Sequence, residues 1–296
     1  MKTILVLTDF SIRAEHATFY ALKLAQKVKA NLLLCNVFDI ADTRPESAIA
    51  PWPAGNFENF EENSNNNMAE LTCRLNIQLK NRTAVGEFMP EIKHCSRPGP
   101  LSEAIIEMTS RHHIQMAVIS THSADGLSTF LLGDHANEII ENAQCPVLIV
   151  PYQLPFSGFK KIAFATDLTH SGADILHSLY GLSKYFDSEI LITHVTAERS
   201  ASTEERDIIN GFFDSRPADV NYPKMYYRAI RNKSIAAGLS LLAEQSDIDL
   251  LVLVHRKRNL FQKLFEGSVT HKLADHLSKP MLVFPGSRVQ AELPVL

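Results

Sequence analysis

One stretch of the chain occurs twice, and each copy has the pattern of a strand, a loop, a helix and a second strand. The copies span residues 116–150 and 250–284. In each copy an apolar run leads into a polar loop, and a helical pattern then begins at a glycine, Gly133 or Gly267. Orphan backbone N–H groups and the positive end of the helix dipole gather at such a helix start. Both copies can therefore hold an anion.

The repetition extends over two whole halves of the chain. Asp9 follows the first apolar run of one half, and Asp167 follows the first apolar run of the other. The interval between these two residues equals the interval between Val37 and Val195, near the ends of the second apolar runs. The interval between the two loop glycines, Gly133 and Gly267, is shorter than this shared interval. Each repeat therefore has the size of a domain, and the first carries extra residues before its loop.

Apolar runs alternate with helical patterns in both halves, which is typical of a doubly wound parallel sheet covered on both faces. The expected domains are residues 1–151 and 159–286. The extra residues of the first domain, about 39–67, are polar and rich in turn formers. We expect a long, partly mobile surface loop there. A helix over 68–82 and a strand near 88–95 are expected to follow.

Charge and composition exclude several classes of function. The formal net charge is −4 and the pI about 6.3, so no basic field attracts nucleic acid or an anionic membrane. The hydrophobic fraction of 45% and the charged fraction of 21% are ordinary for a globular protein. No apolar run reaches the length of a membrane span. We expect a cytoplasmic protein without nucleic acid or membrane partners.

The cysteines and histidines do not form a recognisable metal motif. The four cysteines are Cys35, Cys73, Cys95 and Cys145, and none belongs to a C-x-x-C pair. We expect inert thiols rather than a metal or redox site. The twelve histidines lack zinc-site spacing, so no metal site is expected. His122 and His255 share one position in the two loops, where either could touch a phosphate.

The repeated loop resembles the nucleotide loop of the universal stress protein family. The family pattern is glycine, two residues, glycine, nine residues, glycine, and then serine or threonine. The second half has Val254, Lys257, Gly267 and Ser268 at these positions. The first half has Ser120, Ser123, Gly133 and Asp134. Both halves keep the spacing and match the residue types in part.

This resemblance implies two Rossmann-like domains of the adenine nucleotide alpha hydrolase type. Family members pair through the last strand of the domain, so the strands at 147–150 and 281–284 should form an intramolecular pseudo-dimer. Two chains should then associate as a homo-dimer. The implied function is that of a cytoplasmic stress-response regulator that binds an adenine nucleotide, ATP or ADP, together with Mg²⁺.

The family also implies which residues contact the nucleotide, since the acid after the first strand meets the adenosine and the loop holds the phosphates. In the second half the implied site residues are Thr166, Asp167, Val195, Val254, His255, Lys257, Gly267, Ser268 and Val269. In the first half the corresponding degenerate site comprises Thr8, Asp9, Val37, Ser120, Ser123 and Gly133.

The second half is expected to bind nucleotide better than the first. Asp134 replaces the hydroxyl residue beside the phosphates in the first half. A carboxylate about 4 Å from a phosphate costs about 4 kcal/mol at an effective dielectric of 20, roughly a thousandfold in affinity. Ser268 keeps the hydroxyl and Lys257 adds a cation. Val254 and Lys257, however, replace glycines that allow close approach of the backbone.

Other interpretations remain open at this point. Asp9 and Asp167 could be ordinary helix caps, and so could Asp134. The fold could also act without nucleotide, as a protein-interaction module that uses a sheet edge and the loop at 38–67. The third possibility is an enzyme, but the sequence contains no G-x-x-x-x-G-K-[ST], G-x-G-x-x-G or G-x-S-x-G motif. We expect no catalytic residues, although slow hydrolysis of bound ATP is conceivable.

Overall fold

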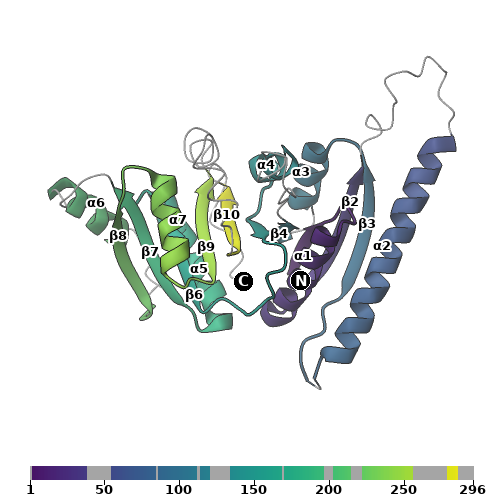
Figure 1. The fold of residues 1–296 in the computed structure, drawn as a ribbon, viewed down its shortest axis with the longest axis horizontal. Coiled ribbons are helices and arrows are strands. Elements are labelled where there is room, and N and C mark those ends of the chain that lie inside the picture. Colours follow the sequence, from purple (N-terminus) through teal and green to yellow (C-terminus); the bar gives the residue numbers. More distant parts are fainter. Residues whose placement is uncertain are drawn as a thin grey trace, which may run out of the picture.

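The computed structural model of the protein describes residues 2–38, 55–84, 86–111, 114–120, 134–168, 170–196, 203–214, 222–255 and 279–285. The strands are β1 Thr3–Leu7, β2 Asn31–Phe38, β3 Ile92–Pro98, β4 Ile114–Ser120, β5 Val147–Val150, β6 Lys161–Ala165, β7 Glu189–Thr196, β8 Met225–Arg231, β9 Leu250–His255 and β10 Met281–Pro285. The helices are α1 Ile12–Val28, α2 Gly55–Arg82, α3 Leu101–Arg111, α4 Asp134–Asn142, α5 His170–Phe186, α6 Thr203–Asp214 and α7 Ile235–Gln245. Strands and helices alternate in both halves, which confirms the predicted α/β class (Figure 1).

The strands form one sheet in the order β3-β2-β1-β4-β5-β10-β9-β6-β7-β8. Within each half the neighbouring strands are parallel, and the order reverses beside the first strand, between β1 and β4 or between β6 and β9. A parallel sheet of this kind binds its ligands at the carboxyl ends of the strands where the order reverses. Each half therefore has one position where a ligand crevice is expected.

The two halves join through their last strands, which are the one antiparallel neighbour pair among the strands of the described residues. Met281 lies opposite Ile149, and Val283 lies opposite Val147. All four side chains are buried, so the junction has the packing of a sheet interior. This pairing confirms the predicted intramolecular pseudo-dimer.

Helices cover both faces of the sheet. The buried side chains of α1, α2, α5 and α6 belong to one apolar core, and those of α3, α4 and α7 belong to the core on the other face. Alternation along β1 shows how one strand serves both cores, since Ile4 and Val6 belong to the first and Leu5 and Leu7 to the second. Each core contains side chains from both halves, so the halves share their apolar interior.

The segment between the halves contributes an aromatic contact as well as a connection. Phe156 packs edge to face against Tyr20 of α1, with ring centroids 5.0 Å apart. It also meets Phe159 at 5.8 Å and Phe186 of α5 at 6.0 Å. Such aromatic pairs add about 0.5–1.5 kcal/mol each beyond the area they bury. Phe156 therefore ties the first helix of each half to the connecting segment.

Helix α2 corrects the expectation of a long surface loop over 39–67. The helix begins at Gly55, well before the expected start at residue 68, and in Figure 1 it lies along β3 at the outer edge of the first half. Residues 39–54 lie outside the described residues. Between residues 56 and 67 only Phe57 and Phe60 are apolar, and Ser64 stands where the apolar spacing would continue toward Met68, so the helical pattern is interrupted.

A buried serine explains how this polar part of α2 is held against the sheet. Ser64 is 6% exposed and lies one helical turn before the buried Met68. Its hydroxyl donates to Asn36 Oδ1 of β2 at 2.8 Å and lies 2.8 Å from the hydroxyl of Ser96 on β3. Hydrogen bonds thus take the place of apolar packing at this position.

Two further elements differ from the expectations or were not foreseen. Strand β3 begins at Ile92 rather than near residue 88, because its position depends on pairing with β2, where Ile92 lies opposite Leu32. Helix α6 was not foreseen, and it lies at the β8 end of the second half, as α2 lies at the β3 end of the first (Figure 1).

Candidate functional site

The chain makes a sharp turn where β1 ends in the first half. Thr8 N donates to Cys35 O at 2.9 Å, which extends the pairing of β1 with β2 by one residue. The Thr8 hydroxyl accepts a hydrogen bond from Phe10 N at 3.1 Å. Phe10 has a φ of 61°, a left-handed conformation that is uncommon for a side chain of this size. Strain of this kind is often found at binding sites, where the surrounding structure holds the turn.

The same turn recurs where β6 ends in the second half. Thr166 N donates to Thr193 O at 2.9 Å, and the Thr166 hydroxyl accepts from Leu168 N at 3.1 Å. Leu168 also has a φ of 61°. The two halves therefore present Asp9 and Asp167 on equivalent backbone turns.

The first-half acid is not the cap of the following helix. The N-cap of α1 is Ser11, whose hydroxyl accepts from Ala14 N at 3.1 Å. Asp9 lies before the cap, and its Oδ1 accepts from Ser11 N at 3.0 Å. The interpretation of Asp9 as an ordinary helix cap is therefore wrong, because Ser11 performs that role. Asp9 remains exposed at the end of the strand.

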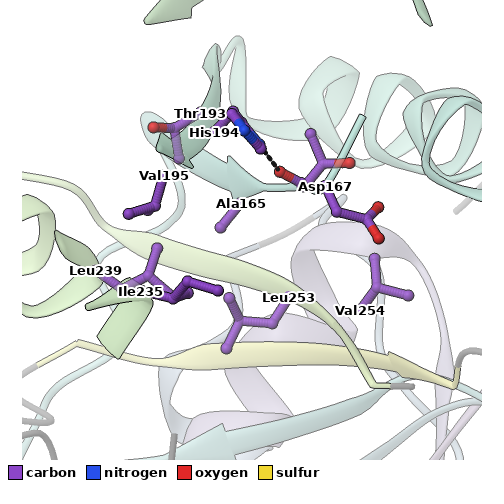
Figure 2. A pocket seen from close by; sticks show the side chains of 10 residues that line it. Ala165, Asp167, Thr193, His194, Val195, Ile235, Leu239, Leu253 and Val254 are labelled. Carbon is purple, nitrogen blue, oxygen red and sulfur yellow. Dashed lines mark hydrogen bonds between the residues drawn. The ribbon is translucent and has the colours of Figure 1, made fainter. Parts of the chain in front are cut away.

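Corresponding side chains support the turn from the second strand of each half. Asn36 Nδ2 donates to Thr8 O at 2.7 Å. His194 occupies the same place in the second half, with its Nδ1 3.2 Å from Thr166 O (Figure 2). A carbonyl oxygen can only accept, so His194 Nδ1 carries the proton in this contact. Sequence reasoning missed both residues, since the sequence does not show which strands are neighbours.

Beside the second-half turn lies a cavity of about 60 Å³. Four residues expected in the second-half site line this one cavity, namely Thr166, Asp167, Val195 and Val254. The other lining residues are Ala165, Thr193, His194, Ile235, Leu239 and Leu253 (Figure 2). The walls are thus mainly apolar, with a few polar groups, as in many small-ligand sites, but the volume is well below the range of about 300–1,000 Å³ of such sites.

Of the remaining residues expected in the second-half site, the structure describes one, His255. His255 is buried at the end of β9, with 8% of its surface exposed, and does not line the cavity. Lys257, Gly267, Ser268 and Val269 lie outside the described residues.

A close approach of helix α7 to β7 forms one wall of this cavity. A Cβ atom added at Gly238 of α7 would lie 2.8 Å from Val195 Cγ1, closer than real side-chain contacts allow. The glycine therefore lets the helix backbone lie directly against Val195. Sequence reasoning missed Gly238, because a single glycine in a helical pattern does not show what it faces.

The first-half cavity is larger, about 480 Å³. The expected residues Thr8, Asp9, Val37 and Ser120 all line it. Ser123 and Gly133 lie outside the described residues. The volume falls within the range of small-molecule sites, about 300–1,000 Å³.

Helix α4 adds a carboxylate to the first-half cavity that sequence reasoning missed. Glu138 lines the cavity, and its Oε1 accepts from Ser102 N at the start of α3 at 2.9 Å. His135 lies 3.9 Å from Glu138 Oε2, measured from its Nδ1. Asp9 has its equivalent in Asp167 of the second-half cavity, so Glu138 is the additional carboxylate, and its charge opposes the binding of a polyphosphate.

Among the described residues, no three His, Cys, Asp or Glu side chains lie close enough together to hold a metal ion. None of the helices in the described ranges has the length and apolar character that a membrane crossing needs.

Comparison with known proteins identifies the family. The model of the universal stress protein family matches the chain twice, over residues 1–151 and 158–285. The chain belongs to the universal stress protein family. It is a tandem member, because each match corresponds to one of the two repeated α/β domains.

Solved structures share this fold over nearly the whole chain. A universal stress protein from Archaeoglobus fulgidus is 13% identical, has a TM-score of 0.69, and is matched over 96% of both chains. A putative universal stress protein from Pseudomonas aeruginosa is also 13% identical, with a TM-score of 0.58, over 96% of this chain and 92% of that one. None of the curated protein sequences matches this universal stress protein.

Proposed function

We propose that this universal stress protein is a cytoplasmic stress-response regulator that binds an adenine nucleotide, ATP or ADP, in its second domain. The observation that carries the proposal is the meeting of four residues around one cavity. Thr166 and Asp167 come from the end of β6, Val195 from β7 and Val254 from β9. They converge at the position where the strand order reverses.

The chemistry of these residues fits the adenosine part of a nucleotide. The Asp167 carboxylate can accept hydrogen bonds from ribose hydroxyl groups. Val195 and Val254 offer apolar contact to a base, and the main chain at Val195 offers hydrogen bonds to it. These groups discriminate a nucleoside from a plain anion.

The sequence after β9 supplies groups suited to phosphates. Gly267 and Ser268 match the phosphate end of the family loop, and Lys257 adds a positive charge. Mg²⁺ would accompany the phosphates and neutralise part of their charge. The first domain has Asp134 at the position of Ser268, and Glu138 follows four residues later.

The first domain is a weaker candidate on electrostatic grounds, although its cavity is larger. Glu138 lines that cavity and would repel a polyphosphate, whereas Asp167 is the one carboxylate among the described lining residues of the second-domain cavity. The first-domain site is therefore proposed to be degenerate.

Thermal unfolding of the full chain with and without millimolar ATP and Mg²⁺ tests this proposal. A ligand at a hundred times its Kd adds about 2.7 kcal/mol, which raises the midpoint by a few degrees. We expect Asp167→Ala to lose the shift. Its matched control, Asp9→Ala, should keep the shift because it changes the same turn of the other domain.

The other outcomes have definite meanings. Loss of the shift in Asp9→Ala alone would move the nucleotide to the first domain. No shift in the wild type, with no nucleotide released on denaturation, would contradict nucleotide binding and favour the protein-interaction role. ADP as the sole extracted nucleotide after incubation with ATP would indicate hydrolysis and contradict a purely binding role.

Association of two chains as a homo-dimer is part of the same proposal. The pairing of β5 with β10 already uses the last strand of each domain within one chain. A second chain would therefore have to use another surface. Light scattering after size-exclusion chromatography should give twice the chain mass of 33.1 kDa, and a single-chain mass would contradict the dimer.

A further inference from the structure

Two cysteines that are far apart in the sequence lie side by side in the first domain. Cys35 of β2 and Cys95 of β3 are direct partners in the parallel register of these strands. Their side chains lie on the same face of the sheet, where both pack in the core shared with α3 and α4. Cys35 is fully buried and Cys95 is partly exposed.

The spacing of the strands permits a disulfide between these residues. Neighbouring strands lie about 4.7–4.9 Å apart, and disulfides join Cα atoms about 4.4–6.8 Å apart. The strand spacing of about 4.7–4.9 Å exceeds the usual Cβ separation in a disulfide, about 3.5–4.5 Å, so a bond requires the two strands to move together. A bond here would be strained, and strained disulfides are the readily reduced kind.

The surroundings of the pair make the two thiols unequal. The Cys35 thiol donates a hydrogen bond to Cys95, which lowers the pKa of Cys95 to about 7, and the nearby Arg97 guanidinium also favours its thiolate. The same hydrogen bond, together with burial, raises the pKa of Cys35. Glu107 of α3 lies 3.7 Å from Arg97, measured from Oε1 to Nη2, and holds that side chain near the strand. Cys95 is thus the nucleophile and Cys35 the proton-bearing partner.

We propose that Cys35 and Cys95 form a dithiol site that hydroperoxides oxidise to a disulfide. In the first step the Cys95 thiolate attacks one peroxide oxygen and breaks the O–O bond. The released alkoxide or hydroxide takes up a proton, and Cys95 becomes a sulfenic acid. Cys35 then attacks the Cys95 sulfur, the S–O bond breaks, and the Cys35 proton leaves with the hydroxide as water. One peroxide thus oxidises two thiols, and exchange with a thiol reductant restores them.

The other two cysteines serve as internal comparisons. Cys145 is buried, and burial raises the pKa of its thiol to about 12, so it is expected to stay inert. Cys73 is exposed on α2. The expectation of inert thiols is thus kept for Cys145, whereas the proposal departs from it for the pair.

The pair also adjoins the first-domain cavity. Cys35 lines that cavity, next to the turn where its carbonyl oxygen accepts from Thr8 N. A disulfide would draw β2 and β3 together at this wall. The proposal does not depend on nucleotide binding, since the chemistry belongs to the two strands themselves.

Peptide mapping of the reduced full chain after treatment with an equimolar amount of hydrogen peroxide tests the proposal. Remaining thiols are blocked with N-ethylmaleimide before digestion. We expect a linked peptide pair containing Cys35 and Cys95, lighter by two hydrogen atoms than the sum of the free peptides, which dithiothreitol separates. Cys73→Ser should leave this product unchanged and serves as the matched control.

Two variants separate the roles of the thiols. Cys35→Ser should leave the sulfenic acid on Cys95, where dimedone captures it, and Cys95→Ser should abolish oxidation of Cys35. In the wild type at pH 7, Cys95 should react with iodoacetamide several-fold faster than in Arg97→Gln, a measurement that needs no substitution of Cys35. Peroxide oxidation confined to Cys73, or Cys35 and Cys95 both recovered as blocked thiols, would overturn the proposal.

Discussion

The two domains share a turn but differ in the crevice beside it. The turns at Thr8 and Thr166 have the same hydrogen bonds, and the residues two places later have the same φ of 61°. The cavities measure about 480 Å³ and about 60 Å³. Repetition of the sequence thus preserves the local backbone geometry, while the room for a ligand depends on how a helix packs over the sheet.

One residue differs between the equivalent helices beside these crevices. Helices α3 and α7 begin at equivalent positions, so Gly238 of α7 corresponds to Ala104 of α3. Gly238 lets α7 lie against Val195. We expect the methyl group of Ala104 to hold α3 farther from its strand, because packed side chains cannot overlap.

The largest expected effect comes from charge at the phosphate end of the repeated loop, where the first domain has Asp134 and the second has Ser268. Ser268→Asp copies Asp134 of the first domain into the second. A carboxylate about 4 Å from a phosphate costs about 4 kcal/mol, so binding of Mg²⁺-ATP should weaken about a thousandfold. Isothermal titration calorimetry measures this change. The matched variant Ser268→Thr keeps the hydroxyl and should bind nearly as well as wild type, and equal binding by Ser268→Asp would place the phosphates elsewhere.

The next effect tests the helix approach itself. Gly238→Ala adds a methyl group that meets Val195 Cγ1 at 2.8 Å, so we expect the free energy of unfolding to fall by about 1–3 kcal/mol despite the better helix propensity of alanine. The reciprocal variant Ala104→Gly should lose about 1 kcal/mol through helix propensity. Urea unfolding followed by circular dichroism measures both. A neutral or stabilising Gly238→Ala would show that α7 can move away from the sheet, against the packing argument.

The smallest effect compares two equivalent helix ends. Lys29 after α1 and Asp187 after α5 are left-handed, with φ of 56° and 54°, where glycine is favoured. Lys29→Gly should stabilise the protein by about 1 kcal/mol, because the left-handed conformation costs a residue with a Cβ about 1–2 kcal/mol and glycine loses part of this gain through its greater freedom in the unfolded chain. Asp187→Gly should stabilise it less at pH 7, because it removes the hydrogen bond from Lys224 Nζ to Asp187 Oδ1 at 2.6 Å. Thermal unfolding of the two variants at pH 7 tests this order.

The same comparison has a defined pH dependence. The hydrogen bond from Lys224 and the lysine charge lower the pKa of Asp187 in the folded protein. A carboxylate with a lowered folded pKa contributes stability above its unfolded pKa and loses it as the pH falls through the folded value. The gap between Lys29→Gly and Asp187→Gly should therefore narrow as the pH falls below about 4. A gap that stays constant down to pH 3 would show that the ion pair contributes nothing.

Much of the fold followed from patterns along the chain, and the failures have physical causes. Apolar runs and helical spacing indicated the repeated domains, and the resemblance to the family implied the pairing of their last strands, which the β5–β10 register confirms. Residues 55–67, which the sequence predicts to be part of a loop, form the first turns of α2, where Ser64 is buried through hydrogen bonds rather than apolar contact. Periodicity of hydrophobicity cannot detect a buried face built from polar groups.

The candidate site was predictable only where one strand or turn supplies the residues. Thr166 and Asp167 could be chosen because they end an apolar run, and both line the second-half cavity. The sequence does not indicate Glu138 or His194, because their contacts depend on which elements pack together. His255 is the opposite case. Its position in the repeated loop pattern suggested a phosphate contact, but the structure buries it at the end of β9, and it does not line the cavity.

The sequence by itself determined the family, the two repeated α/β domains and the acidic turn that ends the first strand of each. Those features depend on residues close together in the chain, where hydrophobic spacing and backbone preference act directly. Tertiary structure alone decided the sizes of the two crevices and the meeting of Cys35 with Cys95. Both depend on strand register and helix approach, and these are set by packing among residues distant in sequence.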